Sequence, residues 1–144
     1  GSLINDQAVK MAAYYRPHFE VGGDYYDVVK MGSEQFGFCI ADVSGKGISA
    51  AILMSNFQAS LRALFTKEIS LHRLVEKLNE RVFDTAKGEK FITLFIARYN
   101  ERTRVLEYVN AGHNPPIFYN MQSNKPTLLT TGCIGLGMLE EIGY

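Results

Sequence analysis

The spacing of apolar residues changes twice along the chain, and these changes predict its secondary structure. Residues 25–31 and 35–43 are rich in aromatic and β-branched side chains and flank a turn at 32–33, which predicts a β-hairpin. Upstream, residues 8–15 predict a further strand. This strand should end before Pro17, because proline lacks the amide hydrogen that a strand donates and restricts the residue before it.

Helical spacing replaces the strand pattern after residue 47. Apolar residues recur every three or four positions and predict an amphipathic helix from residue 48 to about 66; they are Leu53, Phe57, Leu61 and Leu64. A second helix should begin after Ser70, whose hydroxyl can accept a hydrogen bond from a free amide of the first turn. Its apolar stripe consists of Leu71, Leu74, Val75, Leu78 and Val82.

Strand patterns return in the last third of the chain. Residues 91–99 are apolar on both alternating faces, which is typical of a strand buried between layers, so we expect it to be central in a sheet. Residues 104–110, 117–119 and 127–129 predict three further strands separated by polar turns. The order of strands, two helices and strands predicts an α+β domain in which both helices cover one face of the sheet.

Composition restricts the class of protein. With 144 residues, 47% of them hydrophobic, the chain is expected to form one domain. The 15 basic and 15 acidic residues balance, so nothing suggests a nucleic-acid partner or an anionic membrane surface. No apolar run approaches the roughly 20 residues that span a bilayer, and a cytoplasmic location is expected. Cys39 and Cys133 are expected to be reduced.

Two acidic positions lie where a predicted strand meets glycines. Asp24 follows Gly22 and Gly23, and Asp42 precedes the glycine-rich residues 43–47. Carboxylate and carbonyl oxygens suit Mg²⁺ or Mn²⁺, and glycines let a main-chain carbonyl and a phosphate approach closely. A structural alternative is that Asp24 caps a turn and Asp42 caps the following helix. The local residues alone leave both interpretations open.

The sequence Gly45-Lys46-Gly47 precedes a helix, and free helix amides with a lysine attract anions. A nucleotide-binding switch is therefore a further hypothesis. The Walker motif, however, needs Ser or Thr after its lysine and a glycine six residues before it, and both are absent. We expect Lys46 to face solvent and to help attract an anionic substrate.

Residues 110–116, Asn-Ala-Gly-His-Asn-Pro-Pro, combine an imidazole with a turn and a rigid double proline. His113 could act as an acid or a base. It could equally be structural and hydrogen-bonded to nearby backbone, because no nucleophile or carboxylate lies beside it in the sequence.

Four of these motifs together resemble the PPM family of metal-dependent serine/threonine phosphatases, in its branch of bacterial stage II sporulation protein E and RsbU-like proteins. The resemblance extends from about residue 14 to 137 and keeps the family's order and spacing. The four motifs are residues 21–27, 41–47 with the alanines at 50 and 51, 91–95, and 110–116.

The resemblance implies an αββα sandwich with two Mn²⁺ or Mg²⁺ ions. Asp24 would bind one ion, Asp42 would bridge both, and the main-chain carbonyl of Val43 would complete the second contact. A metal-activated water would then attack the phosphorus of a phosphoserine or phosphothreonine on a partner protein, with no covalent enzyme intermediate. A candidate partner is a small phosphorylated anti-sigma-factor antagonist in a bacterial signalling pathway.

Four further residues are expected to shape the site or contact the substrate: Ser44, Gly45, Lys46 and His113. Some relatives carry a histidine, a general-acid candidate, two positions after the bridging aspartate. Here Ser44 occupies that position, so the proton donor stays unassigned.

The family continues past the Gly-x-x-Leu-Gly segment, matched by residues 132–137, into an Asp-Gly motif that supplies another metal ligand. The expected domain therefore covers residues 3–144 and is incomplete at its C-terminus, with a partial metal site and low activity. Gly1-Ser2 resembles an expression leader. The alternative is a non-catalytic regulatory module that keeps the fold. The sequence leaves the substrate, the oligomeric state and the choice of metal open.

Overall fold

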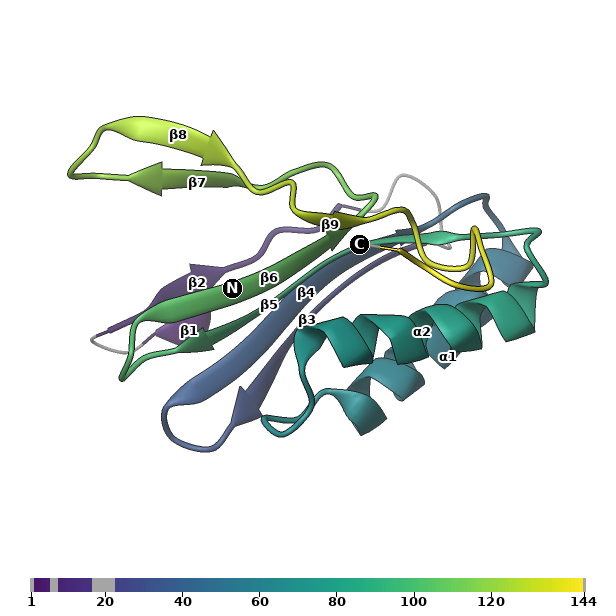
Figure 1. Cartoon of the computed structure of the whole chain (residues 1–144), viewed down its shortest axis with the longest axis horizontal. Helices are drawn as coiled ribbons and strands as arrows, with labels where there is room; N and C mark the ends of the chain where they lie inside the picture. The colour runs from purple at the N-terminus through teal and green to yellow at the C-terminus, as the bar shows by residue number, and fades with distance from the viewer. Residues whose placement is uncertain (1, 6–7, 17–22, 144) are drawn as a thin grey trace.

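A five-stranded sheet with two helices on one face forms the centre of the computed structural model, which describes residues 2–5, 8–16 and 23–143 (Figure 1). Its strand order is β3-β4-β5-β6-β9, and every neighbouring pair is antiparallel except β6 and β9. The strands are β3 (Asp24–Met31), β4 (Gln35–Val43), β5 (Ile92–Asn100), β6 (Val105–Ala111) and β9 (Gly132–Cys133).

The predicted hairpin is confirmed as β3 and β4. It pairs without interruption from Asp24 opposite Asp42 to Met31 opposite Gln35. Gly32 opens the turn with φ 79°, a conformation that favours glycine. The strand expected to be central is β5, the third of the five strands, and it is buried over most of its length, as its apolar sequence predicted.

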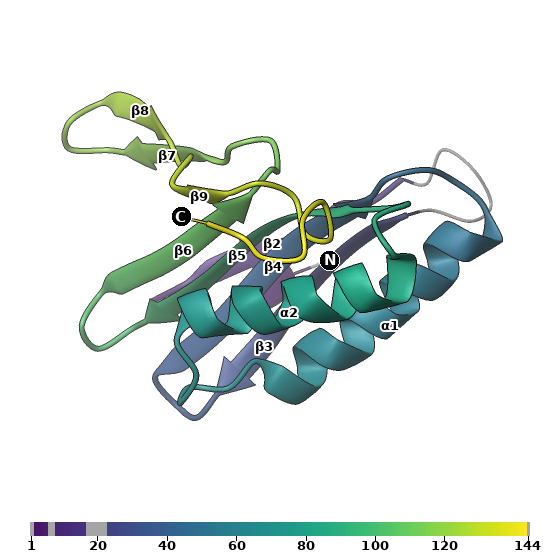
Figure 2. The ribbon, with the colours of Figure 1, turned by 45° about the vertical axis from the view of Figure 1, so that its right-hand side comes forward.

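Both predicted helices are present as α1 (Ile48–Leu64) and α2 (Leu71–Ala86). The two helices lie side by side on one face of the sheet, as Figures 1 and 2 show. The Ser70 hydroxyl accepts a hydrogen bond from the Arg73 amide at 3.1 Å, which confirms the expected cap of α2. The residue that caps α1 is Gly47, so Asp42 does not cap this helix.

The core lies between the helices and the sheet. Alternate residues of β4 point toward the helices, and there Cys39, Ala41 and Val43 are buried. From the helices, Leu61 and Leu74 are fully buried against them. Burying one such leucine stabilises the fold by about 2 kcal/mol, so this layer holds the sheet and the helices together.

The opposite face of the sheet carries apolar side chains that are partly exposed; Tyr26 is 42% exposed and Ile40 46%. A two-stranded ribbon of β1 (Ser2–Asn5) and β2 (Lys10–Ala12) contributes the buried Ile4, which lines a cavity with Phe36 of this face. The α+β class is thus confirmed, and both helices of the described residues lie on one face of the sheet (Figure 1).

One predicted strand needs correction. The strand expected over 8–15 extends only from Lys10 to Ala12, because within the described residues β2 pairs with the short β1 and this pairing is irregular. The expected end at Pro17 lies outside the described residues. The strands at 117–119 and 127–129 are confirmed as a separate hairpin of β7 (Ile117–Asn120) and β8 (Lys125–Leu128). β1 and β9 were not predicted.

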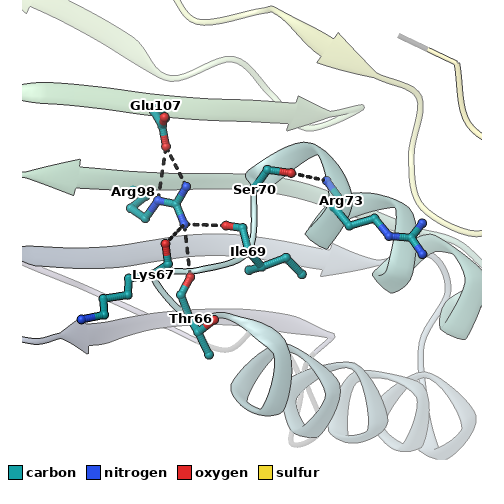
Figure 3. A network of polar contacts seen from close by, with 7 residues as sticks. All are labelled: Thr66, Lys67, Ile69, Ser70, Arg73, Arg98 and Glu107. Carbon is teal, nitrogen blue, oxygen red and sulfur yellow. Dashed lines mark hydrogen bonds and ion pairs between the residues drawn. The ribbon is translucent and has the colours of Figure 1, made fainter.

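Arg98 of β5 is hydrogen-bonded to the linker between the two helices (Figure 3). The Arg98 guanidinium donates hydrogen bonds to the carbonyl oxygens of Thr66 at 3.1 Å, Lys67 at 3.4 Å and Ile69 at 2.7 Å. It also pairs with Glu107 of the neighbouring strand at 2.9 Å. Three linker carbonyls are therefore satisfied by one side chain that extends from β5.

The two cysteines are both free thiols, as expected. None of the helices in the described ranges has the length and apolar character needed to cross a membrane.

Candidate metal centre

The register of the β3–β4 hairpin brings two carboxylates together. Asp24 begins β3 and lies directly opposite Asp42, near the end of β4. Both belong to the face of the sheet that the helices leave uncovered, and both residues are exposed to solvent. Thr93 of β5 lies opposite Asp42 on its other side. The strand ends thus place an acidic pair at one edge of the sheet.

The two carboxylates influence each other. Partial burial raises the pKa of Asp42, and the charge of Asp24 and a hydrogen bond with its carboxyl group raise it further. Ionising both groups in the folded protein therefore costs free energy. A divalent cation at the pair would offset this repulsion.

Glycine at position 23 makes room beside Asp42. A Cβ atom on Gly23 would lie 2.5 Å from Cγ1 of Val43, 3.4 Å from the Val43 carbonyl oxygen and 3.7 Å from Oδ1 of Asp42. Because the Val43 amide donates to the Gly23 carbonyl at 3.1 Å, the two strands stay close here. The carbonyl oxygen of Val43 and Oδ1 of Asp42 thus border the space that a side chain at position 23 would enter.

This donor set suits Mg²⁺ or Mn²⁺, since it consists of oxygens only. Among the described residues no group of three or more His, Cys, Asp or Glu side chains could hold a metal ion. The centre present in this part of the chain is therefore the carboxylate pair, together with the carbonyl oxygen of Val43.

The glycine-rich loop after Asp42 is hydrogen-bonded to Phe91, the residue before β5. The Ser44 hydroxyl accepts from the Phe91 amide at 2.9 Å, and the Ser44 amide donates to the Phe91 carbonyl at 2.8 Å. Gly45 has φ 85°, and the Lys90 amine lies so close that a Cβ on Gly45 would be 2.7 Å from it. Lys46 is exposed, as expected. Sequence reasoning missed Lys90, which adds a second amine beside the loop.

His113 is brought to the acidic pair from the loop after β6. Its Nδ1 lies 3.0 Å from the Thr93 hydroxyl, and its amide donates to Oδ1 of Asn110 at 2.8 Å. Burial lowers the pKa of His113, whereas the carboxylates of Asp42 and Asp24 act to raise it. Sequence reasoning missed Thr93 and Asn110; the available signal was that Thr93 is the single polar residue within 91–97.

Asp27, three residues after Asp24, belongs to a different site. Its carboxylate accepts hydrogen bonds from Arg62 of α1 and from Tyr25. It therefore lies on the helix face of the sheet, away from Asp24 and Asp42. Its role is to join β3 to α1.

Several known proteins are similar to this chain. The family model described as "Stage II sporulation protein E (SpoIIE)" matches residues 32–144, a stretch that includes Asp42 and His113. The "Phosphoserine phosphatase RsbU" of Bacillus subtilis (strain 168) is 32% identical over 139 residues, which cover 96% of this chain and 41% of that protein. The "Phosphoserine phosphatase RsbP" of the same organism is 25% identical over 146 residues, covering 99% of this chain and 36% of that protein. The chain thus spans about two fifths of the length of these relatives.

Solved structures share the fold. A Mycobacterium tuberculosis protein with RsbU and RsbW domains has a TM-score of 0.74 at 21% identity, covering 88% of this chain and 36% of that one. RsbX in complex with magnesium has a TM-score of 0.69 at 16% identity, covering 85% and 57%. The PP2C phosphatase domain of SpoIIE from Bacillus subtilis has a TM-score of 0.68 at 16% identity, covering 85% and 36%. The fold is therefore that of the PP2C phosphatases, and the chain belongs to the stage II sporulation protein E (SpoIIE) family.

Proposed function

We propose that this chain carries the front part of a metal-dependent phosphatase that removes phosphate from phosphoserine or phosphothreonine on a partner signalling protein. The observation that carries the proposal is the strand register that sets Asp24 opposite Asp42. Relatives named phosphoserine phosphatases, which align over nearly the whole chain, support the same reaction class.

Asp24, Asp42 and the Val43 carbonyl would hold Mn²⁺ or Mg²⁺, two ions in the complete domain. When bound, the two ions lower the pKa of a shared water and offset charge on the phosphoryl oxygens. The magnesium complex of RsbX, which shares the fold, supports Mg²⁺ as one choice.

The chain's own side chains bind and orient the substrate. The amine of Lys90 beside Gly45 and that of the exposed Lys46 attract the phosphate dianion to the glycine-rich loop. Gly45 itself leaves space for that approach. The Ser44 hydroxyl accepts a hydrogen bond from the Phe91 amide, which holds the loop in place, and the proton donor stays unassigned.

The candidate partner is a small phosphorylated anti-sigma-factor antagonist, as the family resemblance implies, in the cytoplasm of a bacterium. The net charge of the chain is zero, so overall charge does not attract the substrate to the chain. Recognition therefore depends on local contacts around the loop.

The 144-residue chain by itself has low activity in this proposal. A divalent magnesium ion takes six ligands in near-octahedral geometry. Two carboxylates and one carbonyl supply fewer protein oxygens than two ions need to be held firmly, so the ions bind weakly.

The test uses the natural protein that contains this segment. With Mn²⁺ it should hydrolyse a phosphoserine peptide, and Asp42→Asn should lower the turnover about 10²-fold or more, because the charge that holds the ions is lost. Arg102→Met, at the far end of the sheet, is the matched control and should keep its activity. Metal-independent turnover, or none, would contradict the proposal and favour the non-catalytic regulatory module.

The proposed impairment has its own test. The isolated 144-residue chain should hydrolyse p-nitrophenyl phosphate slowly or not at all with Mn²⁺. A rapid hydrolysis that Asp42→Asn abolishes would show that the impairment is wrong while leaving the reaction class intact.

A further inference from the structure

Two hydrogen bonds hold His113, one at its backbone amide and one at its imidazole ring. At one end the His113 amide donates to Oδ1 of Asn110 at 2.8 Å, and at the other Nδ1 lies 3.0 Å from the Thr93 hydroxyl. Thr93 and Asp42 are opposite residues of neighbouring strands. The ring is therefore held over the same strand positions that carry the acidic pair.

The base of this arrangement is rigid. Asn110 is 4% exposed, and its Nδ2 donates to the Leu129 carbonyl at 3.2 Å. Its backbone amide donates to the Thr131 carbonyl at 3.0 Å. A buried amide side chain that both donates and accepts a hydrogen bond has little freedom to move. The loop that carries His113 therefore starts from a fixed point.

The Thr93 hydroxyl contacts Nδ1 of the ring, so the direction of this hydrogen bond sets which ring nitrogen carries the hydrogen. A hydroxyl has one hydrogen to donate, and Nδ1 at 3.0 Å is nearer to it than the Asp42 carbonyl oxygen at 3.5 Å. If Thr93 donates to Nδ1, this nitrogen is an acceptor and a neutral ring carries its hydrogen on Nε2. The neutral form agrees with the burial of the ring, which lowers the pKa of His113.

We propose that His113 donates a hydrogen bond from Nε2 to the phosphoryl group of the substrate, and that Thr93 and Asn110 are positioning residues that set its tautomer and orientation. The proposal rests on the proposed phosphatase function. It gives a role to a side chain that electrostatically interacts with both carboxylates but belongs to neither strand. The Ser44 hydroxyl, by contrast, holds its own loop by accepting a hydrogen bond from the Phe91 amide.

Thr93 offers a matched pair of variants. Thr93→Val keeps the shape of the side chain but removes the hydroxyl, whereas Thr93→Ser keeps the hydroxyl. In the natural full-length protein, Thr93→Val should lower kcat about 10- to 100-fold with little change in KM, as the loss of an orienting partner does. Thr93→Ser should restore kcat to near the unsubstituted value, which a role in packing the β-branched side chain would not.

The tautomer is measured independently of activity, in the 144-residue chain, by long-range ¹H–¹⁵N NMR of the imidazoles. His113→Gln assigns the signals, and His72, which pairs with Glu76 on α2, is the internal reference. We expect His113 to carry its hydrogen on Nε2 in the unsubstituted chain. In Thr93→Val the ring should populate both tautomers, whereas in Thr93→Ser it should keep the Nε2 tautomer. A hydrogen on Nδ1 in the unsubstituted chain would overturn the proposal, whether or not the variants fold.

Mn²⁺ alone tests the position of the ring. Its paramagnetism should broaden the His113 signals at lower concentration than those of His72, and Asp42→Asn should remove this difference. Equal broadening of both histidines would refute the proposed position. If the full-length protein shows no turnover while the tautomer and the broadening are as expected, the phosphatase function fails and the positioning role of Thr93 stands.

Discussion

Arg98 provides the sharpest test of how the helices are held on the sheet. We consider Arg98→Met, which keeps an apolar side chain of similar length and removes the guanidinium. The variant loses hydrogen bonds to the carbonyls of Thr66, Lys67 and Ile69 and the ion pair with Glu107 (Figure 3). All of these contacts join β5 either to the α1–α2 linker or to β6.

The contacts contribute unequally to stability. Glu107 has a side chain that is 56% exposed, so the ion pair adds little. Thr66 and Lys67 are exposed, and their carbonyls regain water after the change. The bond to the half-buried Ile69, at 2.7 Å, is the shortest of the three, and a hydrogen bond to a charged group contributes about 1.5–3 kcal/mol. We therefore expect the free energy of unfolding to fall by about 2–3 kcal/mol.

Urea and thermal unfolding followed by circular dichroism measure this change. For a domain of this size the midpoint temperature should fall by about 6–9 °C. The matched control is Arg102→Met: the side chain of Arg102 is 70% exposed and pairs only with the exposed Glu34, so the expected loss is below about 0.5 kcal/mol. If both variants lose the same free energy, or Arg98→Met loses less than about 1 kcal/mol, the linker is not held by Arg98 and the reasoning is refuted.

Three further predictions concern the acidic pair, the thiols and the C-terminal segment. Because the pKa of Asp42 is raised in the folded state, that state retains its proton to higher pH than the unfolded chain, so this carboxyl should lower the free energy of unfolding as pH rises above about 4. Asp24→Asn should reduce this pH dependence and stabilise the metal-free chain at pH 7 by about 0.2–1 kcal/mol in urea titrations, and an unchanged or lower stability would contradict it. Burial raises the pKa of Cys39 to about 12, so a thiol reagent at pH 8 should modify Cys133 in the native protein and Cys39 only after denaturation; rapid modification of both would be inconsistent with the buried thiol. Asn79→Ala should lower the free energy of unfolding by about 2–3 kcal/mol. The buried side-chain amide donates hydrogen bonds to the Leu139 and Glu140 carbonyls and accepts one from the Gly137 amide, and all three are lost. A loss of stability near zero would mean that water replaces these bonds.

The sequence by itself determined the elements whose pattern is long and regular. The aromatic and β-branched residues of 25–31 and 35–43, with the turn between them, were sufficient for the hairpin. Helical spacing was sufficient for both helices, because burial of one helix face imposes its period on consecutive residues. β9 escaped prediction because a strand of two residues contains too few positions to show a period, and β1 escaped prediction as well. The family motifs predicted Asp24 and Asp42 as metal ligands before any contact was known.

Only the tertiary structure decided which side chains meet. Asp24 and Asp42 are opposite residues because of the hairpin register, and His113 reaches Thr93 because β6 lies beside β5. The same register directs Asp27 to the helix face. Such contacts join residues that are 18 to 20 or more positions apart, and their geometry depends on strand order and packing. A periodic pattern records which face of its own segment is buried, but it holds no information about which distant side chain lies across from it.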